Sequence, residues 1–175
     1  MNHLWVLDAG CVLGNMVPCG AKIIQIDPSI DSIMKVIYIN APVVRDSSFL
    51  NDIRVDTDRG YAYISDSGLG AIIVVNLLTG ESRLLDGHVS VLSEENLLSI
   101  NGQLVNWKTH VNGIALTQNG DHLYYKSLSG FNLYRISTEF LRDTVYYPCT
   151  VEAAVQMVCA ILPSDGMEFD KHGNL

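Results

Sequence analysis

Three polar residues stand at matching places along this sequence. Asn51, Asn112 and Asp165 each open a short stretch, NDIRVD, NGIALT and DGMEF, in which polar and apolar residues alternate. They lie roughly 50 to 60 residues apart, which is too far for local contact but fits a structural repeat. Amide and carboxylate oxygens are hard ligands that suit Ca²⁺, Mg²⁺ or Mn²⁺ better than copper or structural zinc. Whether these groups act together depends on the elements that carry them.

The elements that carry these residues belong to an internal repeat. The stretch FLNDIRVDTDRGYAYISDSGLGAIIVVNLLTGES (49–82) aligns with HVNGIALTQNGDHLYYKSLSGFNLYRISTEF (110–140), and PSDGMEFDKHGNL (163–175) starts the pattern a third time. Alternating apolar positions predict short strands, and Gly, Asn and Asp mark the turns between them. Four antiparallel strands in sequence, repeated, are typical of a β-propeller blade, whose first strand lines the central channel. The three polar residues are therefore expected to converge at one mouth of that channel.

The whole chain, residues 1–175, is predicted to be an all-β partial β-propeller. Because LWVLDAG (4–10) matches YAYISDSG (61–68), the chain is expected to start at the second strand of a blade. The predicted order begins with a blade lacking its first strand (1–40) and a full blade (49–95). A hairpin insert with an Asn101-Gly102 turn (97–105) and a second blade (110–148) follow. The chain then forms one short helix with Thr150 as its N-cap (150–161) and the first strand of a further blade (163–175). Either a longer protein has been cut at both ends, or the first and last pieces complete a shared blade.

Composition and charge exclude several classes of partner. Lys and Arg total 11 against 19 Asp and Glu, and the net charge of −8 disfavours nucleic acid and anionic lipid. The longest apolar runs, AIIVVNLL and AAVQMVCAIL, are shorter than the roughly 18 residues that span a bilayer. MNHLWVLDAG shows no basic region followed by a long apolar core, so no signal peptide is visible in these residues. SGLGA lacks the lysine and helix of a phosphate loop, and we expect no organic cofactor.

The histidines and cysteines show no spacing typical of a metal site. His88 and His110 lie in loops that flank the expected channel strand, so we interpret them as candidate ligand-binding residues; the alternative is that they are solvent-exposed loop residues. The four cysteines form no CxxC pair. We expect free thiols packed among apolar residues or, alternatively, a Cys11–Cys19 bridge in an oxidising compartment.

Four motifs carry a resemblance to a known family. LWVLDAG, FLNDIRVDTDRGYAYISDSG, GIALTQNGDHLYYKSLSGFNLYRISTEFLRD and SDGMEFDKHGNL resemble successive motifs of the major royal jelly protein and yellow family, including its bacterial members. The resemblance extends over nearly the whole chain. It implies a six-bladed propeller, of which this chain would supply about three blade-equivalents. Members of the family are secreted and often non-catalytic, so the resemblance favours an extracellular or periplasmic location.

A more distant resemblance concerns the gluconolactonase and senescence marker protein group. In that group the first strands of successive blades present an Asn, an Asn and an Asp to a divalent cation, together with a Glu from another blade. Matched motif by motif, this implies that Asn51, Asn112 and Asp165 are metal ligands, and the glutamate has no counterpart in this chain. With such a glutamate, the ion could activate water for lactone hydrolysis while Asp165 takes up a proton. Alternatively, the three side chains bond their own backbone at strand entries.

Three functions are compatible with these expectations. The first is a propeller that binds a small apolar or amine-bearing molecule at the channel mouth, with Asn51, Asn112, His88 and His110 as candidate ligand-binding residues. The second is a metal-dependent lactone or ester hydrolase with Asp165 as its catalytic carboxylate. The third is a non-functional remnant of a longer gene product. Unpaired sheet edges also favour self-association, in which two copies close a six-bladed ring.

Overall fold

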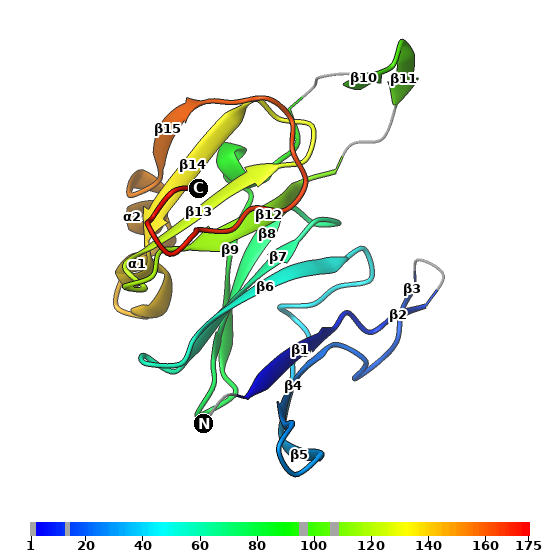
Figure 1. Cartoon of the computed structure of the whole chain (residues 1–175), viewed down its shortest axis with the longest axis vertical. Coiled ribbons are helices and arrows are strands. Elements are labelled where there is room, and N and C mark those ends of the chain that lie inside the picture. Colours follow the sequence, from blue (N-terminus) through cyan, green and yellow to red (C-terminus); the bar gives the residue numbers. More distant parts are fainter. Residues whose placement is uncertain (1–2, 13–14, 95–97, 106–108) are drawn as a thin grey trace.

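The computed structural model describes residues 3–12, 15–94, 98–105 and 109–175. Three antiparallel sheets lie side by side in chain order and form the body of the molecule (Figure 1). Strand β6 of the middle sheet contacts β1 of the first sheet and β12 of the third. This arrangement confirms the prediction of an all-β fold of the propeller type. Within the described residues, no helix has the length and apolar character needed to cross a membrane.

The first sheet has three strands in the order β1-β4-β5. Their bounds are β1 Leu4–Asp8, β4 Lys22–Asp27 and β5 Ser32–Tyr38. A two-stranded ribbon interrupts the connection from β1 to β4, with the bounds β2 Cys11–Val12 and β3 Asn15–Met16. The sheet therefore has the strands expected of a blade without its first strand.

The middle sheet has four strands in the order β6-β7-β8-β9. Their bounds are β6 Leu50–Asp56, β7 Tyr61–Asp66, β8 Ala71–Asn76 and β9 Ser82–Asp86. A 3₁₀ turn, η1 (Val89–Val91), and a hairpin follow, the hairpin having the bounds β10 Leu98–Ile100 and β11 Gln103–Val105. The predicted Asn101-Gly102 turn is confirmed, because both residues have positive φ, at 52° and 80°, as a two-residue hairpin turn requires. Residue 97 of the predicted 97–105 insert lies outside the described residues.

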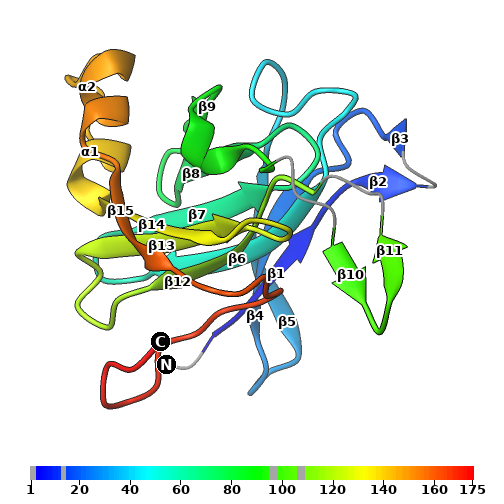
Figure 2. The same ribbon diagram turned by 90° about the horizontal axis from the view of Figure 1, so that it is seen from above.

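The third sheet has four strands in the order β12-β13-β14-β15. Their bounds are β12 Val111–Leu116, β13 His122–Ser127, β14 Asn132–Ser137 and β15 Gln156–Ala160. Two short helices stand between β14 and β15, α1 Thr138–Arg142 and α2 Pro148–Ala153. Figure 2 shows α1 and α2 together at one side of the sheets and the β10–β11 hairpin projecting at the other.

The prediction of a helix over 150–161 is wrong in its boundaries. The helix begins at Pro148, with Tyr147 rather than Thr150 at the N-cap, because proline is favoured in the first turn, where its missing N–H costs nothing. It ends at Ala153, and the following run forms β15 instead. The edge of β14 offers unpaired backbone groups, and pairing with β15 satisfies them. Sheet pairing therefore determines the secondary structure of residues 156–160, whose apolar pattern fits either a helix or a strand.

The prediction that 163–175 contains a strand is also wrong. From residue 163 to 169 the chain has no assigned strand, although it runs alongside β12 (Figure 1). No second strand of the same blade pairs with it in the described residues, so no ladder forms. The turn predicted after it is present: Asp170 N donates to Asn174 O at 2.9 Å, and His172 N donates to Asp170 Oδ1 at 2.8 Å.

The core consists of two apolar clusters, one on each face of the middle sheet. Ile73 and Val75 pack toward the first sheet, whereas Ile72 and Val74 pack toward the third. Successive strand residues point to opposite faces, so a strand buried on both faces must be apolar throughout. The run AIIVV of β8 meets this requirement, and each of its residues is at most 2% exposed.

The cysteines differ from the sequence expectation. All four are free thiols, so Cys11 and Cys19 are not bridged in this structure. Cys19, Cys149 and Cys159 are exposed and Cys11 is half-buried, so the predicted apolar packing is wrong for three of the four. Cys19 lies in a turn with a φ of 56°, and Cys159 lies on the outer strand β15, where nothing covers it within the described residues.

Two buried tyrosines allow a test of the packing between the second and third sheets. Tyr63 and Tyr125 are both fully buried, but only the Tyr125 hydroxyl has a hydrogen-bond partner among the described residues, Ser90 Oγ at 2.9 Å. Replacing Tyr125 by Phe should lower the free energy of unfolding by about 1 kcal/mol, because it removes that bond. Replacing Tyr63 by Phe should change it little or raise it. Urea unfolding of the two variants measures the difference, and equal losses would contradict it.

Candidate functional site

The same irregularity occurs at the start of both inner strands, β6 and β12. In β6, two residues, Asn51 and Asp52, stand opposite one residue of β7. In β12, Asn112 and Gly113 stand opposite one residue of β13. Such a β-bulge bends its strand and re-aims the side chains within it. The repeat therefore places an asparagine at an equivalent bulge in successive sheets.

The bulges bring the three predicted residues together. Asn51 Nδ2 donates to Asn112 Oδ1 in a close contact, and Asn112 Nδ2 donates to Asp165 Oδ1 at 3.1 Å. Asn112 is buried, whereas Asn51 and Asp165 are exposed, so the row is open to solvent on one side. We call these three residues the axial row. Their alternative role, bonding their own backbone at a strand entry, is not what these contacts show.

The direction of these hydrogen bonds decides which atoms remain for a ligand. Each asparagine uses its amide nitrogen as donor, and Asn112 uses its oxygen as acceptor. Asn51 Oδ1 and Asp165 Oδ2 have no hydrogen-bond donor among the described residues. Both are hard oxygen acceptors, which suit either a divalent cation or an ammonium group.

The residues opposite the two bulges, Ser65 and Lys126, hydrogen-bond to backbone groups near the axial row. Ser65 Oγ accepts from Asp52 N at 3.1 Å and donates to Asn112 O at 2.7 Å, so it joins the bulge of β6 to that of β12. Lys126 occupies the equivalent place in the third sheet and donates from Nζ to Leu162 O at 2.8 Å. Its side chain is fully buried, and burial lowers the pKa of the ammonium group. Lys126 was not among the site residues predicted from the sequence, although the alignment of HLYYKS with YAYISD places it at the position of Ser65.

A second layer of polar contacts crosses between the inner segments. Arg54 Nη1 lies 2.6 Å from Asp52 Oδ1, and Arg54 Nη2 donates to Met167 O at 2.6 Å. Arg54 Nε is 3.2 Å from Glu168 Oε2, which adds an ion pair. Asp52 Oδ2 is in turn 3.5 Å from Ile114 N of β12. Asp52 therefore links two sheets and, through Arg54, the terminal segment.

Gly113 allows the terminal segment to approach the bulge. A Cβ on this residue would lie 2.2 Å from Asp165 O, far inside the closest separation of such atoms. The backbone of Asp165 can therefore reach Asn112 only because residue 113 has no side chain. Gly166, one residue beyond Asp165, has no atom within 4 Å of the place where its Cβ would be.

The two histidines predicted to bind a ligand have their described contacts in loops. His88 Nδ1 lies 2.8 Å from Ser90 Oγ and caps η1. His110 Nδ1 accepts from Ser93 N at 2.9 Å. Neither has a described hydrogen bond with the axial row, and a ligand role for them stays a prediction.

The donor set of the axial row fits a weakly bound hard cation. In the described residues there is no group of three or more His, Cys, Asp and Glu side chains that could hold a metal. The axial row contains one carboxylate and two amides, and one amide oxygen is already hydrogen-bonded. An ion held there would therefore take few protein ligands and complete its shell with water.

A set of antiparallel blades with polar residues meeting at the inner strands defines a β-propeller protein. Comparison with known proteins identifies the family. The Major royal jelly protein family matches residues 1–158, and the chain belongs to that family. The chain is 26% identical over 153 residues to major royal jelly protein 3 and 24% identical over 156 residues to major royal jelly protein 1, both from Apis mellifera. Each match covers 83% of this chain but only 28% and 36% of those relatives.

A solved structure supports the fold. Hydrazine synthase from Kuenenia stuttgartiensis matches 98% of this chain with a TM-score of 0.62, over 50% of the matched chain. The sequence identity is 12%, so the likeness concerns the fold alone. This chain therefore spans about a third of the length of its curated relatives and half the length of the matched structure.

Replacing Gly113 by Ala should separate Asp165 from Asn112, because the new methyl group overlaps Asp165 O. In NMR spectra a nuclear Overhauser cross-peak should connect the Asn112 side-chain amide protons with the Cβ protons of Asp165 in the wild type, and it should disappear in the variant. Gly166→Ala is the matched control and should keep this cross-peak. An equally strong cross-peak in Gly113→Ala and in the wild type would show that the close approach is not needed.

Proposed function

We propose that this chain is part of a propeller that binds a small molecule at the mouth of the central channel, together with a weakly held divalent cation. The contact chain from Asn51 through Asn112 to Asp165 is the observation that supports it. Two exposed residues of this row present oxygen acceptors that have no donor among the described residues. Oxygen acceptors of this kind bind either a hard cation or the ammonium group of an amine.

The residues of the row would share the work of binding. Asn51 Oδ1 and Asp165 Oδ2 would hold the cation, and Asn112 would position both neighbours through its amide. A bound cation would supply positive charge that attracts a polar ligand oxygen. An amine-bearing ligand would use the same acceptors directly, so amine and cation should compete.

The proposal for this chain is restricted to binding. Lactone hydrolysis by Asp165 would need the glutamate that the distant resemblance assigns to another blade, and no residue of this chain matches it. Hydrolytic activity is therefore expected only where further blades complete the ring. Family membership also leads us to propose an extracellular or periplasmic location.

Titration with Ca²⁺ and Mn²⁺ tests the cation site. We expect dissociation constants of roughly 0.1 to 1 mM, because a single carboxylate contributes charge. Asp165→Asn keeps the shape of the side chain and should weaken binding at least about tenfold, since it removes that charge. Asp58→Asn, in the exposed turn between β6 and β7, is the control and should bind as the wild type does. Mn²⁺ should broaden the NMR signals of Asn51 and Asn112 first.

A competing amine tests the small-molecule part. Benzylamine should displace Mn²⁺ from the wild type and restore the broadened signals, whereas benzyl alcohol should not, because it carries no charge. Cation binding that is equally strong in wild type and Asp165→Asn, or its absence from both, would contradict the proposal.

We also propose self-association through the open face of the first sheet. Leu4, Val36 and Tyr38 lie on the face turned away from the core and are 52%, 38% and 52% exposed. Burial of such a face is favourable by roughly 25 cal/mol per Å². Sedimentation velocity should therefore show a dimer, which Val36→Lys weakens and Thr57→Lys, at an exposed turn, does not. A monomer at all concentrations would refute this expectation.

A further inference from the structure

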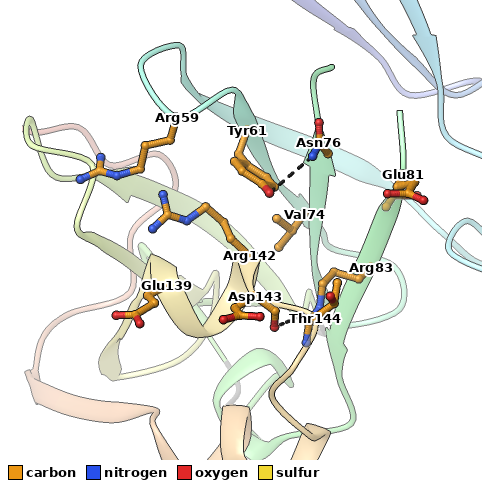
Figure 3. A pocket seen from close by; sticks show the side chains of 11 residues that line it. Arg59, Tyr61, Val74, Asn76, Glu81, Arg83, Glu139, Arg142, Asp143 and Thr144 are labelled. Carbon is orange, nitrogen blue, oxygen red and sulfur yellow. Dashed lines mark hydrogen bonds between the residues drawn. The ribbon is translucent and has the colours of Figure 1, made fainter. Parts of the chain in front are cut away.

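A cavity lies between the middle sheet and helix α1, and none of the residues that line it belongs to the axial row. Its volume is about 1000 Å³, at the upper end of the range typical of small-molecule sites. Figure 3 shows side chains from β7, β8, β9 and α1 around it. The lining residues that carry the argument are Tyr61, Val74, Asn76, Arg83, Glu139 and Arg142.

An insertion in the third sheet builds one wall of this cavity. In the middle sheet a tight turn at Gly80 joins β8 to β9, whereas in the third sheet α1 and α2 separate β14 from β15. Helix α1 contacts β8, and α2 contacts β9. The first residue of α1, Thr138, is fully buried and donates from Oγ1 to Gly120 O at 2.6 Å. This hydrogen bond anchors α1 to the third sheet.

Two guanidinium groups at the cavity have no ion-pair partner in the part of the chain that the structure describes. Arg142 lies over the Tyr61 ring, with its guanidinium carbon 5.7 Å from the ring centre. Arg83 donates from Nη1 only to a backbone oxygen, Asp143 O, at 2.5 Å. Arg59 differs, because it pairs with Asp56 at 3.1 Å and Asp121 at 2.7 Å.

Three carboxylates also line the cavity, and each has a hydrogen bond within its own segment. Glu139 is exposed and accepts from Tyr146 OH at 3.4 Å. Asp143 Oδ1 accepts from Val145 N at 2.8 Å in the turn that follows α1. Glu81 is exposed and accepts from Thr79 Oγ1 at 3.3 Å. Arg83 and Arg142 therefore remain half-buried cations beside a cavity, in a chain whose net charge is −8.

We propose that this cavity binds a small organic carboxylate with an aromatic or apolar body. The planar guanidinium groups of Arg83 and Arg142 match the geometry of a carboxylate, which each can bind through two hydrogen bonds. The Tyr61 ring and Val74 offer apolar surface to the body of the ligand, and the Asn76 amide, 3.4 Å from Tyr61 OH, offers a further polar contact. This site is independent of the axial row and of the function proposed for it.

Calorimetric titration with phenylacetate tests the site. We expect millimolar binding that weakens as salt is added, because the attraction is partly exposed to solvent. Arg83→Gln and Arg142→Gln should each weaken binding roughly tenfold or more, since each removes a charged donor. Arg135→Gln is the matched control: Arg135 also lies over a tyrosine ring, 6.0 Å from the centre of Tyr124, but does not line the cavity. It should bind phenylacetate as the wild type does.

Further arms define the ligand class and protect the test against misfolding. 2-Phenylethanol should not bind, and inorganic phosphate should bind more weakly than phenylacetate; phosphate binding of equal strength would overturn the proposed class. If Arg142→Gln loses its cooperative unfolding transition, binding is measured with Arg83→Gln and Arg142→Lys instead. Arg142→Lys should bind phenylacetate several-fold more weakly than the wild type, because lysine lacks the planar guanidinium group. Asp165→Asn should leave phenylacetate binding unchanged. No binding by the wild type, or equal binding by the wild type and the folded arginine variants, would overturn the proposal.

Discussion

The axial row depends on one irregularity of strand pairing, the β-bulge at the start of β6 and of β12. A regular strand would turn neighbouring side chains to opposite faces of its sheet, into the packing between blades. The bulge instead gives Asn51 and Asn112 equivalent directions, so that they meet each other and Asp165. Ser65 makes this arrangement stable, because it hydrogen-bonds backbone groups of both bulged strands.

Packing on both faces of the middle sheet restricts where the two proposed sites can lie. The strand β8 is buried on both sides, so its sheet has no free face, and polar chemistry is left to strand ends and strand edges. The inner ends carry the axial row. The outer strands, together with the inserted helix α1, carry the cavity near Arg142. The groups that we propose as ligand contacts differ as well, because the axial row presents a carboxylate and the cavity presents the guanidinium groups of Arg83 and Arg142.

Neighbouring charges determine which arginines are available to a ligand. Arg54 is enclosed by Asp52 and Glu168 and serves to hold the terminal segment against β6. Arg59 is likewise paired with two carboxylates. Arg83 and Arg142 have ring or backbone contacts in place of carboxylates within the described residues. The same residue type therefore has a structural role in one place and a binding role, as we propose, in another.

The repeat and the period-two alternation in the sequence were enough to determine the blades, the Asn101-Gly102 turn and the meeting of the axial row, because equivalent positions of successive blades must lie around one axis. The local pattern could not determine the secondary structure of residues 156–160, because their apolar run suits a helix or a strand. The open edge of β14, which pairs with this run, makes it a strand. The local pattern also could not decide 163–169, where a strand-like pattern has no partner. The cavity between β9 and α1 depended on tertiary structure alone, since Arg83 and Arg142 have no equivalents in the repeat and only the packing of an inserted helix brings them to one place.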